Sequence, residues 1–269
     1  MFANIGSGIT QLCKFGLPTL DEIVGGGLPR GTTWLIEDEI GADADPFIMS
    51  FLANGLQAMD YIFLLSTEQT FDHYRKTFQT FGRNPDMELQ TGRLRFIDGF
   101  SGSYQIGLTS SSGGIGFGSS VSDMNHDDGI ETVRDLTQPR EINEAIRRSL
   151  LHVQEGPTTG IRGACLSLST IIYSSGDFRD VYSFIQNRRA MDKIKNSTTI
   201  LSIHRDAHDE KIMRAIEHAA NGVLKVSRKQ VNNNSVLEIE VMAFNDKPES
   251  VGRKASFYYV GGRLSPAEY

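Results

Sequence analysis

Short apolar runs of strand length alternate with helix-periodic segments along most of the chain, and this alternation limits the fold more than any other feature. The runs are TTWLIE (32–37), YIFLLS (61–66), RLRFID (93–98), ACLSLST (164–170) and TTILSIH (198–204). Between the second and third runs, four aromatic residues at spacings of three and four predict a helix over residues 71–81. Uniformly apolar strands separated by helices are typical of a mostly parallel sheet with helices on both faces. The sequence therefore predicts an α/β fold.

The last part of the chain follows a different pattern. GVLKVSR, SVLEIEVMAF and SFYYV succeed one another without intervening helices, which predicts an antiparallel meander at the edge of the sheet. Residues 99–130 are rich in glycine and serine and lack periodicity, so we expect a flexible surface loop there. We predict a single domain over residues 1–269.

Charge and cysteine content narrow the class of protein. The formal net charge is −6 and the pI is about 5.6, which disfavours a general nucleic-acid binder. Cys13 and Cys165 are too few for a disulfide framework. The N-terminal residues lack the pattern of a signal peptide, and no apolar run approaches the roughly 20 residues of a membrane helix. These observations predict a cytoplasmic protein without membrane contact.

The segment FGLPTLDEIVGGGLPRGTTWLIE (15–37), followed by FLANGL and YIFLLSTEQTFDHYRKTFQTFG (61–82), carries a family resemblance. It resembles the RecA-superfamily ATPases of the KaiC type, a mostly archaeal group whose members share a Gly-x-Pro-x-Leu-Asp-x-x-x-Gly-Gly-Gly-x-Pro-x-Gly segment before the phosphate loop. Weaker similarity continues over nearly the whole chain. The resemblance implies a RecA-like fold: a mostly parallel sheet, helices on both faces and a C-terminal antiparallel meander.

The same resemblance places the phosphate loop, or Walker A motif, at residues 38–45. Such a loop uses glycines to wrap phosphates with backbone N–H groups, a lysine to neutralise them and a hydroxyl to bind Mg²⁺. Here Asp38 and Asp43 fall at the two glycines, Ala44 at the lysine and Asp45 at the hydroxyl position, while Gly41 remains. The acids expected to face a polyphosphate, and to repel it, are Glu37, Asp38, Glu39, Asp43 and Asp45.

The other positions that the resemblance assigns to nucleotide chemistry are altered too. Leu166 falls at the Walker B aspartate, which binds the metal in active relatives. Glu68 and Gln69 replace the paired acids after the second strand and are the remnant of a catalytic site. Ala243 and Asn245 replace a Lys-x-Arg pair offered to the neighbouring subunit. We therefore expect degenerate Walker A and Walker B motifs, no catalytic residues, and no binding of ATP or Mg²⁺.

The sequence suggests what occupies the turn in place of phosphate. Asp45 followed by Pro46 is typical of a helix start, with the carboxylate as N-cap. Our hypothesis is that Asp45, helped by Asp43, supplies the negative charge that phosphate brings to active relatives. Two alternatives stay open: a simple capped helix with a solvated acidic turn, and capture of a divalent cation by the turn.

A second polar cluster follows the strand at 198–204. His204, Asp206 and His208 could together ligate zinc or a related metal, since sites of α/β proteins lie at strand C-termini. Against this, Asp209 is well placed to cap the following helix, and the segment matches an ordinary loop of the family.

These observations favour a non-catalytic pseudo-ATPase that regulates or scaffolds, in signal transduction or in a ring-type assembly. Its expected partners are proteins, as a homo- or hetero-oligomer with RecA/KaiC-like paralogues, similar to the RecA-like subunits of Elongator. One alternative is an enzyme with an atypical site, through residual nucleotide hydrolysis or metal-dependent chemistry at His204 and His208. Another is a ring protein that binds nucleic acid, which the acidic balance disfavours.

Overall fold

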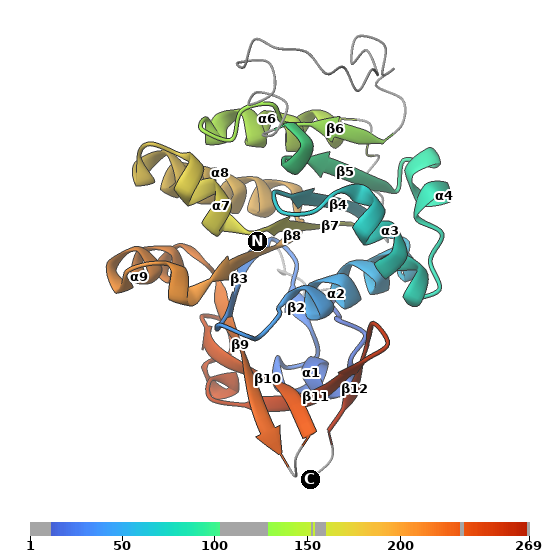
Figure 1. Cartoon of the computed structure of the whole chain (residues 1–269), viewed down its shortest axis with the longest axis vertical. Coiled ribbons are helices and arrows are strands. Elements are labelled where there is room, and N and C mark those ends of the chain that lie inside the picture. The colour runs from blue at the N-terminus through green and yellow to red at the C-terminus, as the bar shows by residue number, and fades with distance from the viewer. Residues whose placement is uncertain (1–11, 103–128, 152, 154–159, 232–233, 268–269) are drawn as a thin grey trace, which may run out of the picture.

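The structure, a computed structural model, describes residues 12–102, 129–151, 153, 160–231 and 234–267, and it is built around one large mixed sheet (Figure 1). The strand order in this sheet is β12-β11-β10-β9-β3-β8-β7-β4-β5-β6. The strands from β9 to β6 in that order are parallel, and β9 to β12 form an antiparallel meander. Both parts of the predicted architecture are confirmed.

The strands of the large sheet are β3 (Thr32–Asp38), β4 (Tyr61–Ser66), β5 (Leu94–Asp98), β6 (Ile130–Thr132), β7 (Ile161–Leu166), β8 (Thr198–His204), β9 (Gly222–Val231), β10 (Asn234–Phe244), β11 (Lys254–Val260) and β12 (Arg263–Pro266). A separate antiparallel pair joins β1 (Leu12–Cys13) to β2 (Leu28–Pro29). The helices are α1 (Pro18–Ile23), α2 (Asp45–Gln57), α3 (Phe71–Thr80), α4 (Pro85–Gln90), α6 (Pro139–Ser149), α7 (Leu168–Ser174), α8 (Phe178–Lys195) and α9 (Glu210–Ala219), with short 3₁₀ turns η2 (Arg205–Ala207) and η3 (Pro248–Ser250).

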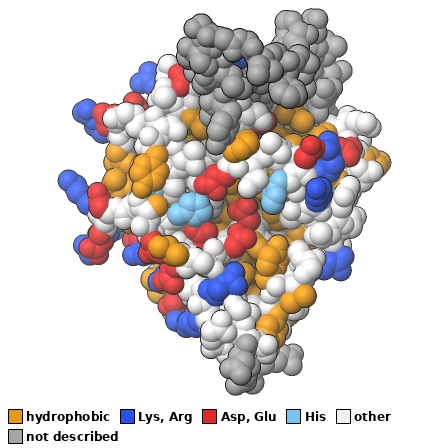
Figure 2. All heavy atoms as spheres, viewed as in Figure 1, with side chains coloured by type: hydrophobic (Ala, Val, Ile, Leu, Met, Phe, Trp, Pro, Cys, Tyr) orange, Lys and Arg blue, Asp and Glu red, His pale blue; other side chains and the backbone are white. Residues whose placement is uncertain are grey.

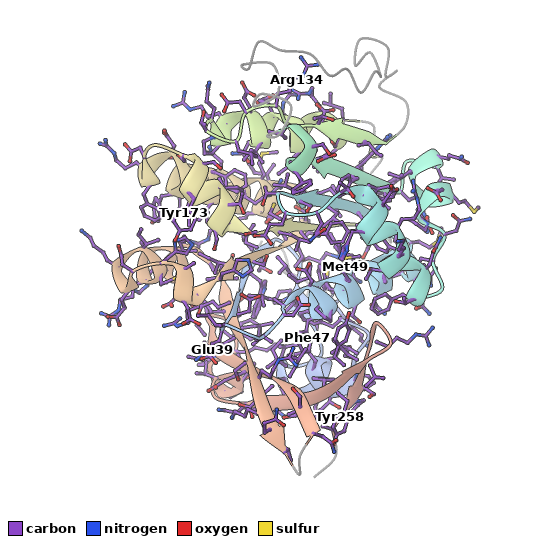
Figure 3. The ribbon with its side chains drawn as sticks, in the orientation of Figure 1. Glu39, Phe47, Met49, Arg134, Tyr173 and Tyr258 are labelled. Carbon is purple, nitrogen blue, oxygen red and sulfur yellow. The ribbon has the colours of Figure 1, made fainter. Side chains whose placement is uncertain are left out.

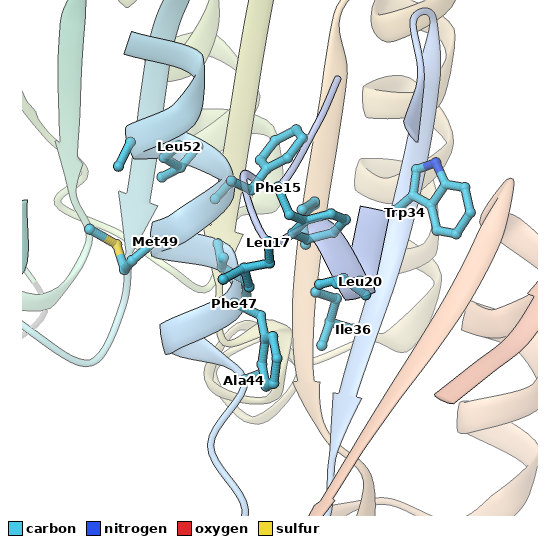
Figure 4. Close-up of a cluster of buried hydrophobic side chains, with 14 of the residues drawn as sticks. Phe15, Leu17, Leu20, Trp34, Ile36, Ala44, Phe47, Met49 and Leu52 are labelled. Atoms are coloured by element: carbon cyan, nitrogen blue, oxygen red, sulfur yellow. The ribbon is translucent and has the colours of Figure 1, made fainter. Parts of the chain in front are cut away.

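The sheet separates two hydrophobic cores, because successive side chains of a strand point to opposite faces. In β3, Ile36 packs into the core that contains α1, α2 and α3, whereas Leu35 packs into the core formed with α6 to α9. The first core includes Ala44 and Phe47 at the start of α2 (Figure 4). The burial of both sheet faces explains why the strands read as continuous apolar runs.

Two predicted boundaries are wrong. The run at 164–170 is not a strand throughout: β7 begins at Ile161 and ends at Leu166, and α7 begins at Leu168. The break occurs at Ser167, whose φ of 63° is left-handed and whose side chain accepts a hydrogen bond from the Thr170 N–H. The region expected as a loop at 99–130 contributes Ile130 to edge strand β6, while its residues 103–128 lie outside the described part of the chain.

A buried ion cluster joins the amino-terminal ends of the strands. Asp60, immediately before β4, accepts from Arg30 Nη2 at 2.7 Å and from Arg162 Nε at 2.6 Å. All three side chains are at most 4% exposed. Asp60 also accepts from the Gly160 N–H at 2.9 Å. We call Arg30, Asp60 and Arg162 the amino-edge cluster. It ties residues far apart in sequence into one rigid edge.

The structure also bears on the cysteines and on membrane-spanning helices. Cys13 and Cys165 are both buried and unpaired within the described residues. Over the same ranges, no helix is both long and apolar enough to cross a membrane.

Candidate functional site at the carboxyl edge of the sheet

The turn between β3 and α2 lies at the carboxyl edge of the parallel strands, where ligand sites of open α/β sheets occur. Gly41 has a φ of +82°, so the turn needs a residue that tolerates the left-handed region at this position. Several contacts hold the turn: Arg228 donates to the Gly41 carbonyl, and Asp206 accepts from the Ile40 N–H at 2.8 Å. Ile40 at its tip is 88% exposed.

The acids of this turn do not all face one space, which corrects the expectation from sequence. Glu37 lies on the opposite face of the sheet, where it is fully buried and pairs with Arg205. Glu39 pairs with Lys225 of β9 at 2.5 Å and lies beside that strand (Figure 3). Asp38, Asp43 and Asp45 remain on the α2 side. The negative charge that would face a polyphosphate therefore comes from three carboxylates of the turn instead of the expected five.

The predicted N-cap is also wrong. Asp45 is the first residue of α2, Ala44 holds the N-cap position, and no side chain of either residue caps the helix. The carboxylates of two other residues accept the N–H groups there: Asp43 from Asp45 N at 2.9 Å and Asp38 from Ala44 N at 3.3 Å. Backbone N–H groups at a helix start are what bind phosphate in active phosphate loops. Here the chain's own carboxylates occupy two of them.

Two of the nucleotide-binding positions inferred from the resemblance hold buried apolar residues. Ala44, at the lysine position, is 1% exposed and packs in the core beside Phe47 (Figure 4). Leu166, at the metal-ligand position, is 3% exposed at the end of β7. Neither side chain can offer charge or a metal ligand to this space.

His204 joins the carboxylates across the edge. Its Nδ1 lies 2.7 Å from Asp38 Oδ1, and its Nε2 lies 3.2 Å from Glu68 Oε1. Asp38 and His204 are register partners at the ends of the neighbouring strands β3 and β8, which explains their contact. Thr170 Oγ1 also donates to Glu68 Oε1, at 3.2 Å. We call Asp38, Glu68 and His204 the carboxyl-edge cluster.

The electrostatics of the site follow from these contacts. Hydrogen bonds to Asp38 and Glu68 raise the pKa of His204 to about 10, so the imidazole is a cation at neutral pH. The hydrogen bond from His204 lowers the pKa of Glu68. Burial, followed by the charges of Asp43, Glu68 and Asp38, raises the pKa of the half-buried Asp45 to about 7. In Figure 2, carboxylate side chains gather beside histidine side chains near the middle of the face shown.

The open space left at this edge is modest. A cavity of 280 Å³ lies over the turn and is bounded by Asp38 and residues 39–42 on one side and by His204, Asp206 and Ala207 on the other. Within the described chain, no lysine or arginine lines this cavity. The cavity therefore lacks the basic side chains that a polyphosphate site uses to bind its ligand.

The proposed metal ligands have separate partners. His204 faces Asp38 and Glu68, whereas Asp206 accepts from the turn at Ile40. His208 Nε2 lies 2.8 Å from Ser169 Oγ, and its ring stacks on Tyr173 at 5.2 Å. Asp209 accepts from the Ile212 N–H at 2.9 Å, which confirms its predicted role as N-cap of α9. Among the described residues, no group of three or more His, Cys, Asp and Glu side chains has the arrangement of a metal site.

The remaining predicted residues lie at two other places. The Gln69 N–H donates to Ser66 Oγ at 3.1 Å, beside Glu68. Ala243 and Asn245, at the end of β10, line a different cavity, which also contains Glu37 and Arg205. They therefore do not face the turn of their own chain.

Sequence reasoning missed the link between His204 and Asp38 and considered His204 only as a metal ligand. It also missed Thr170 of α7 and Lys225 and Arg228 of β9, which contact the site from two separate segments. The order of the strands is the signal that could have found the first link, because β3 and β8 are neighbours and end together.

The sheet order, the position of the turn and the meander define the class of protein: a RecA-like α/β protein. Residues 13–118 match the family model described as "ATPase: KaiC". A UPF0273 protein of Thermotoga maritima is 27% identical over 141 residues, which are 52% of this chain. This match spans about half, 51%, of that relative's length.

Solved structures share the fold over nearly the whole chain. A KaiC-like protein of Pyrococcus horikoshii is 15% identical with a TM-score of 0.65, covering 96% of this chain and 100% of its own. A second protein of that archaeon, crystallised with an unknown peptide, is 14% identical with a TM-score of 0.68, covering 94% and 98%. The flagellar accessory protein FlaH of Methanocaldococcus jannaschii is 15% identical with a TM-score of 0.68, covering 96% and 100%. The chain is thus similar in sequence to the KaiC ATPase family over residues 13–118, and it shares the RecA-like fold of these solved structures.

Proposed function

We propose that the protein is a non-catalytic KaiC-like pseudo-ATPase that regulates or scaffolds other proteins. The observation that carries this proposal is the position of His204 between Asp38 and Glu68. Active phosphate loops bring their positive charge to a nucleotide through a lysine and Mg²⁺. Here the cation of the site is a histidine that the chain's own carboxylates already neutralise.

The environment of α2 supports the same proposal. Two N–H groups at the helix start bind Asp43 and Asp38, so a phosphate would have to displace carboxylates that are part of the chain. Ala44 stands at the lysine position and Leu166 at the metal-ligand position. Both side chains are apolar and buried, so neither function is available in this space. An incoming triphosphate would meet Asp45 and Glu68, while the cation His204 is already paired with Asp38 and Glu68.

Titration calorimetry with Mg·ATP tests the proposal. We expect a dissociation constant no better than about 1 mM, which corresponds to roughly −4 kcal/mol. The double variant Ala44→Lys with Asp45→Thr should show no turnover, because Leu166 still denies the metal a ligand. A dissociation constant below about 100 μM for the native chain would contradict the proposal, and turnover by the double variant would contradict the assignment of positions 38–45.

Protein contact is the mode of action that we favour. Two structural neighbours support this choice: one was crystallised with an unknown peptide, and the other is a flagellar accessory protein. Because the site lacks nucleotide ligands, we expect any homomeric or mixed assembly to keep its mass with or without Mg·ATP. Size-exclusion chromatography with light scattering measures this, and an ATP-dependent ring would contradict the proposal.

An enzyme with an atypical site is the second candidate. Its support is Glu68, whose pKa is lowered by its hydrogen bond from His204 and which holds the position of a water-activating acid in the resemblance. If the purified protein hydrolyses ATP and Glu68→Gln removes that activity, this candidate replaces the first. The separate partners of His204 and His208 give metal-dependent chemistry less support.

A further inference from the structure

A second cavity lies on the opposite face of β3 from the turn and is lined by residues of β3, the meander and α9. Figure 1 shows where these elements lie in the fold. The volume of the cavity is 410 Å³. Glu37 of β3, Arg205 of η2 and Glu217 of α9 form its charged wall. Since Glu37 and Asp38 point to opposite faces of the sheet, this cavity is separate from the carboxyl-edge cluster.

Glu37 is only half satisfied. Its side chain is 1% exposed, and Arg205 Nη1 donates to Oε2. Its other oxygen, Oε1, is buried and has no hydrogen-bond partner in the part of the chain that the structure describes. An ionised carboxylate would need a donor for Oε1, and a protonated one would need an acceptor for its hydrogen. A protonated Glu37 has Glu217 as a hydrogen-bond partner, whereas the ionised form leaves Oε1 without a donor, and native proteins pair nearly all such buried polar atoms.

The charges of the wall favour a cation as the missing partner. One nitrogen, Arg205 Nη1, serves both carboxylates, because it also lies 3.0 Å from Glu217 Oε1. Two acids thus share one base. Burial and the charge of Glu217 raise the pKa of Glu37 to about 7, as expected of a carboxylate with too little positive charge nearby.

Outside the charged wall, the lining contains two polar residues, His218 and Asn245, and is otherwise apolar. Val223 and Ala243 form part of the wall, and Met242 is 42% exposed at the cavity. An unbranched hydrocarbon stem can pack against such side chains, and methionine adapts readily to different shapes. Arg205 is 33% exposed, so its side chain can move to admit a ligand without unfolding the strand.

We propose that this cavity binds an organic cation, a primary ammonium or guanidinium group on an apolar stem, which donates to Glu37 Oε1 and Glu217. A free alkylamine and a lysine or arginine side chain of another protein share this chemistry. The proposal does not depend on the fate of ATP at the turn, because the two cavities lie on opposite faces of the sheet.

The test is a titration of the ¹⁵N-labelled full chain, followed by two-dimensional NMR. The probes are n-butylammonium, n-butylguanidinium and, as a neutral control of the same shape, n-butanol. We expect saturable shifts at residues around β10 and α9 with either cation, and at least tenfold weaker binding of butanol. Equal binding of butanol, or no saturable shift with either cation, would overturn the proposal. Water would then be the hydrogen-bond donor to Glu37 Oε1.

Variants locate the binding site. Glu37→Gln keeps the side-chain shape and should weaken binding of the cations at least tenfold. Glu217→Gln, at the cavity rim, should weaken it about threefold and provides a second variant if Glu37→Gln fails to fold. Glu210→Gln is the matched control, because Glu210 is an exposed acid of the same helix that pairs with Arg214. Unchanged binding in both cavity variants, or equal loss in the control, would contradict the assignment.

The source of the cation can then be distinguished. Short acetylated peptides with one central lysine or arginine are compared with the free butyl cations. Tighter binding of the peptides identifies a protein partner, and tighter binding of the free cations identifies a small molecule. Both results support the cavity as a cation site.

Discussion

The amino-edge and carboxyl-edge clusters are opposite in charge and in exposure. At the amino edge one carboxylate, Asp60, lies between two arginines, and all three side chains are at most 4% exposed. At the carboxyl edge one cation, His204, lies between two carboxylates, and His204 and Glu68 are 47% and 41% exposed. Buried ion pairs cannot exchange partners with water, whereas half-exposed ones can. The comparison indicates that the amino edge holds the fold together and that the carboxyl edge remains able to respond to solution conditions.

The largest expected effect is at the amino edge. Asp60→Asn leaves Arg30 and Arg162 buried without a counter-charge, so we expect the free energy of unfolding to fall by about 3–5 kcal/mol. Urea denaturation measures the change. The control is Asp86→Asn, since Asp86 pairs with Arg75 at the surface and should change stability by at most about 1 kcal/mol. A loss below 1 kcal/mol for Asp60→Asn would show that the two edges do not differ as the burial implies.

The second largest effect is expected for Asp45→Asn at the carboxyl edge, which should raise the free energy of unfolding. The pKa of Asp45 is raised to about 7 in the folded chain, above the value of about 3.9 for an unperturbed aspartate. Folding therefore favours the protonated acid, and the stability that this proton gives is lost as pH rises from about 4 through 7. Asp45→Asn removes the charge, so it should raise the free energy of unfolding at pH 8 by about 1–3 kcal/mol more than at pH 5.

Its control is Asp72→Asn, which changes another acid in the first turn of a helix. Asp72 is 74% exposed and pairs with Arg75, so its loss should lower stability slightly. If Asp45→Asn also lowers stability at pH 8, the negative charge of Asp45 stabilises the helix start after all, which would contradict the raised pKa.

The smallest effect is at His204. Its folded pKa of about 10 lies above the unfolded value of about 6.5, so its ion pairs stabilise the fold fully below pH 6.5 and lose that contribution as pH rises through 10. Because the side chain is 47% exposed, solvent screening limits the effect. We expect His204→Gln to cost about 1 kcal/mol at pH 6 and clearly less at pH 9.

His208→Gln is the matched control for this pH dependence. Burial and the positive charge of His204 lower the pKa of His208 in the folded chain. Its native form is therefore penalised as pH falls through 6.5, which is the reverse of the trend at His204. Chemical denaturation of both variants at pH 6 and pH 9 gives the comparison, and parallel trends would argue against the ion pairs of His204.

The fold could be predicted from sequence wherever local pattern and burial agree. The apolar runs at 32–37, 61–66 and 198–204 became β3, β4 and β8 because both faces of these strands are covered. The run at 164–170 misled because Ser167 breaks the strand through a left-handed backbone conformation that composition does not reveal. The start of β7 was missed because Arg162 is a charged residue in a buried strand. Asp60 and the carbonyls of Lys14 and Phe51 make it acceptable there by accepting its hydrogen bonds.

By itself, the sequence determined which chemical groups stand at the positions of the turn. Whatever the fold, Ala44 carries no charge, Leu166 carries no metal ligand, and Asp45 carries no hydroxyl. Only the tertiary structure decided how the acids are used. Alternation along β3 sends Glu37 and Asp38 to opposite faces, and the neighbouring position of β8 brings His204 to Asp38. Side-chain identity is local, but the neutralisation of charge depends on which strand ends lie side by side, and a linear pattern does not specify that.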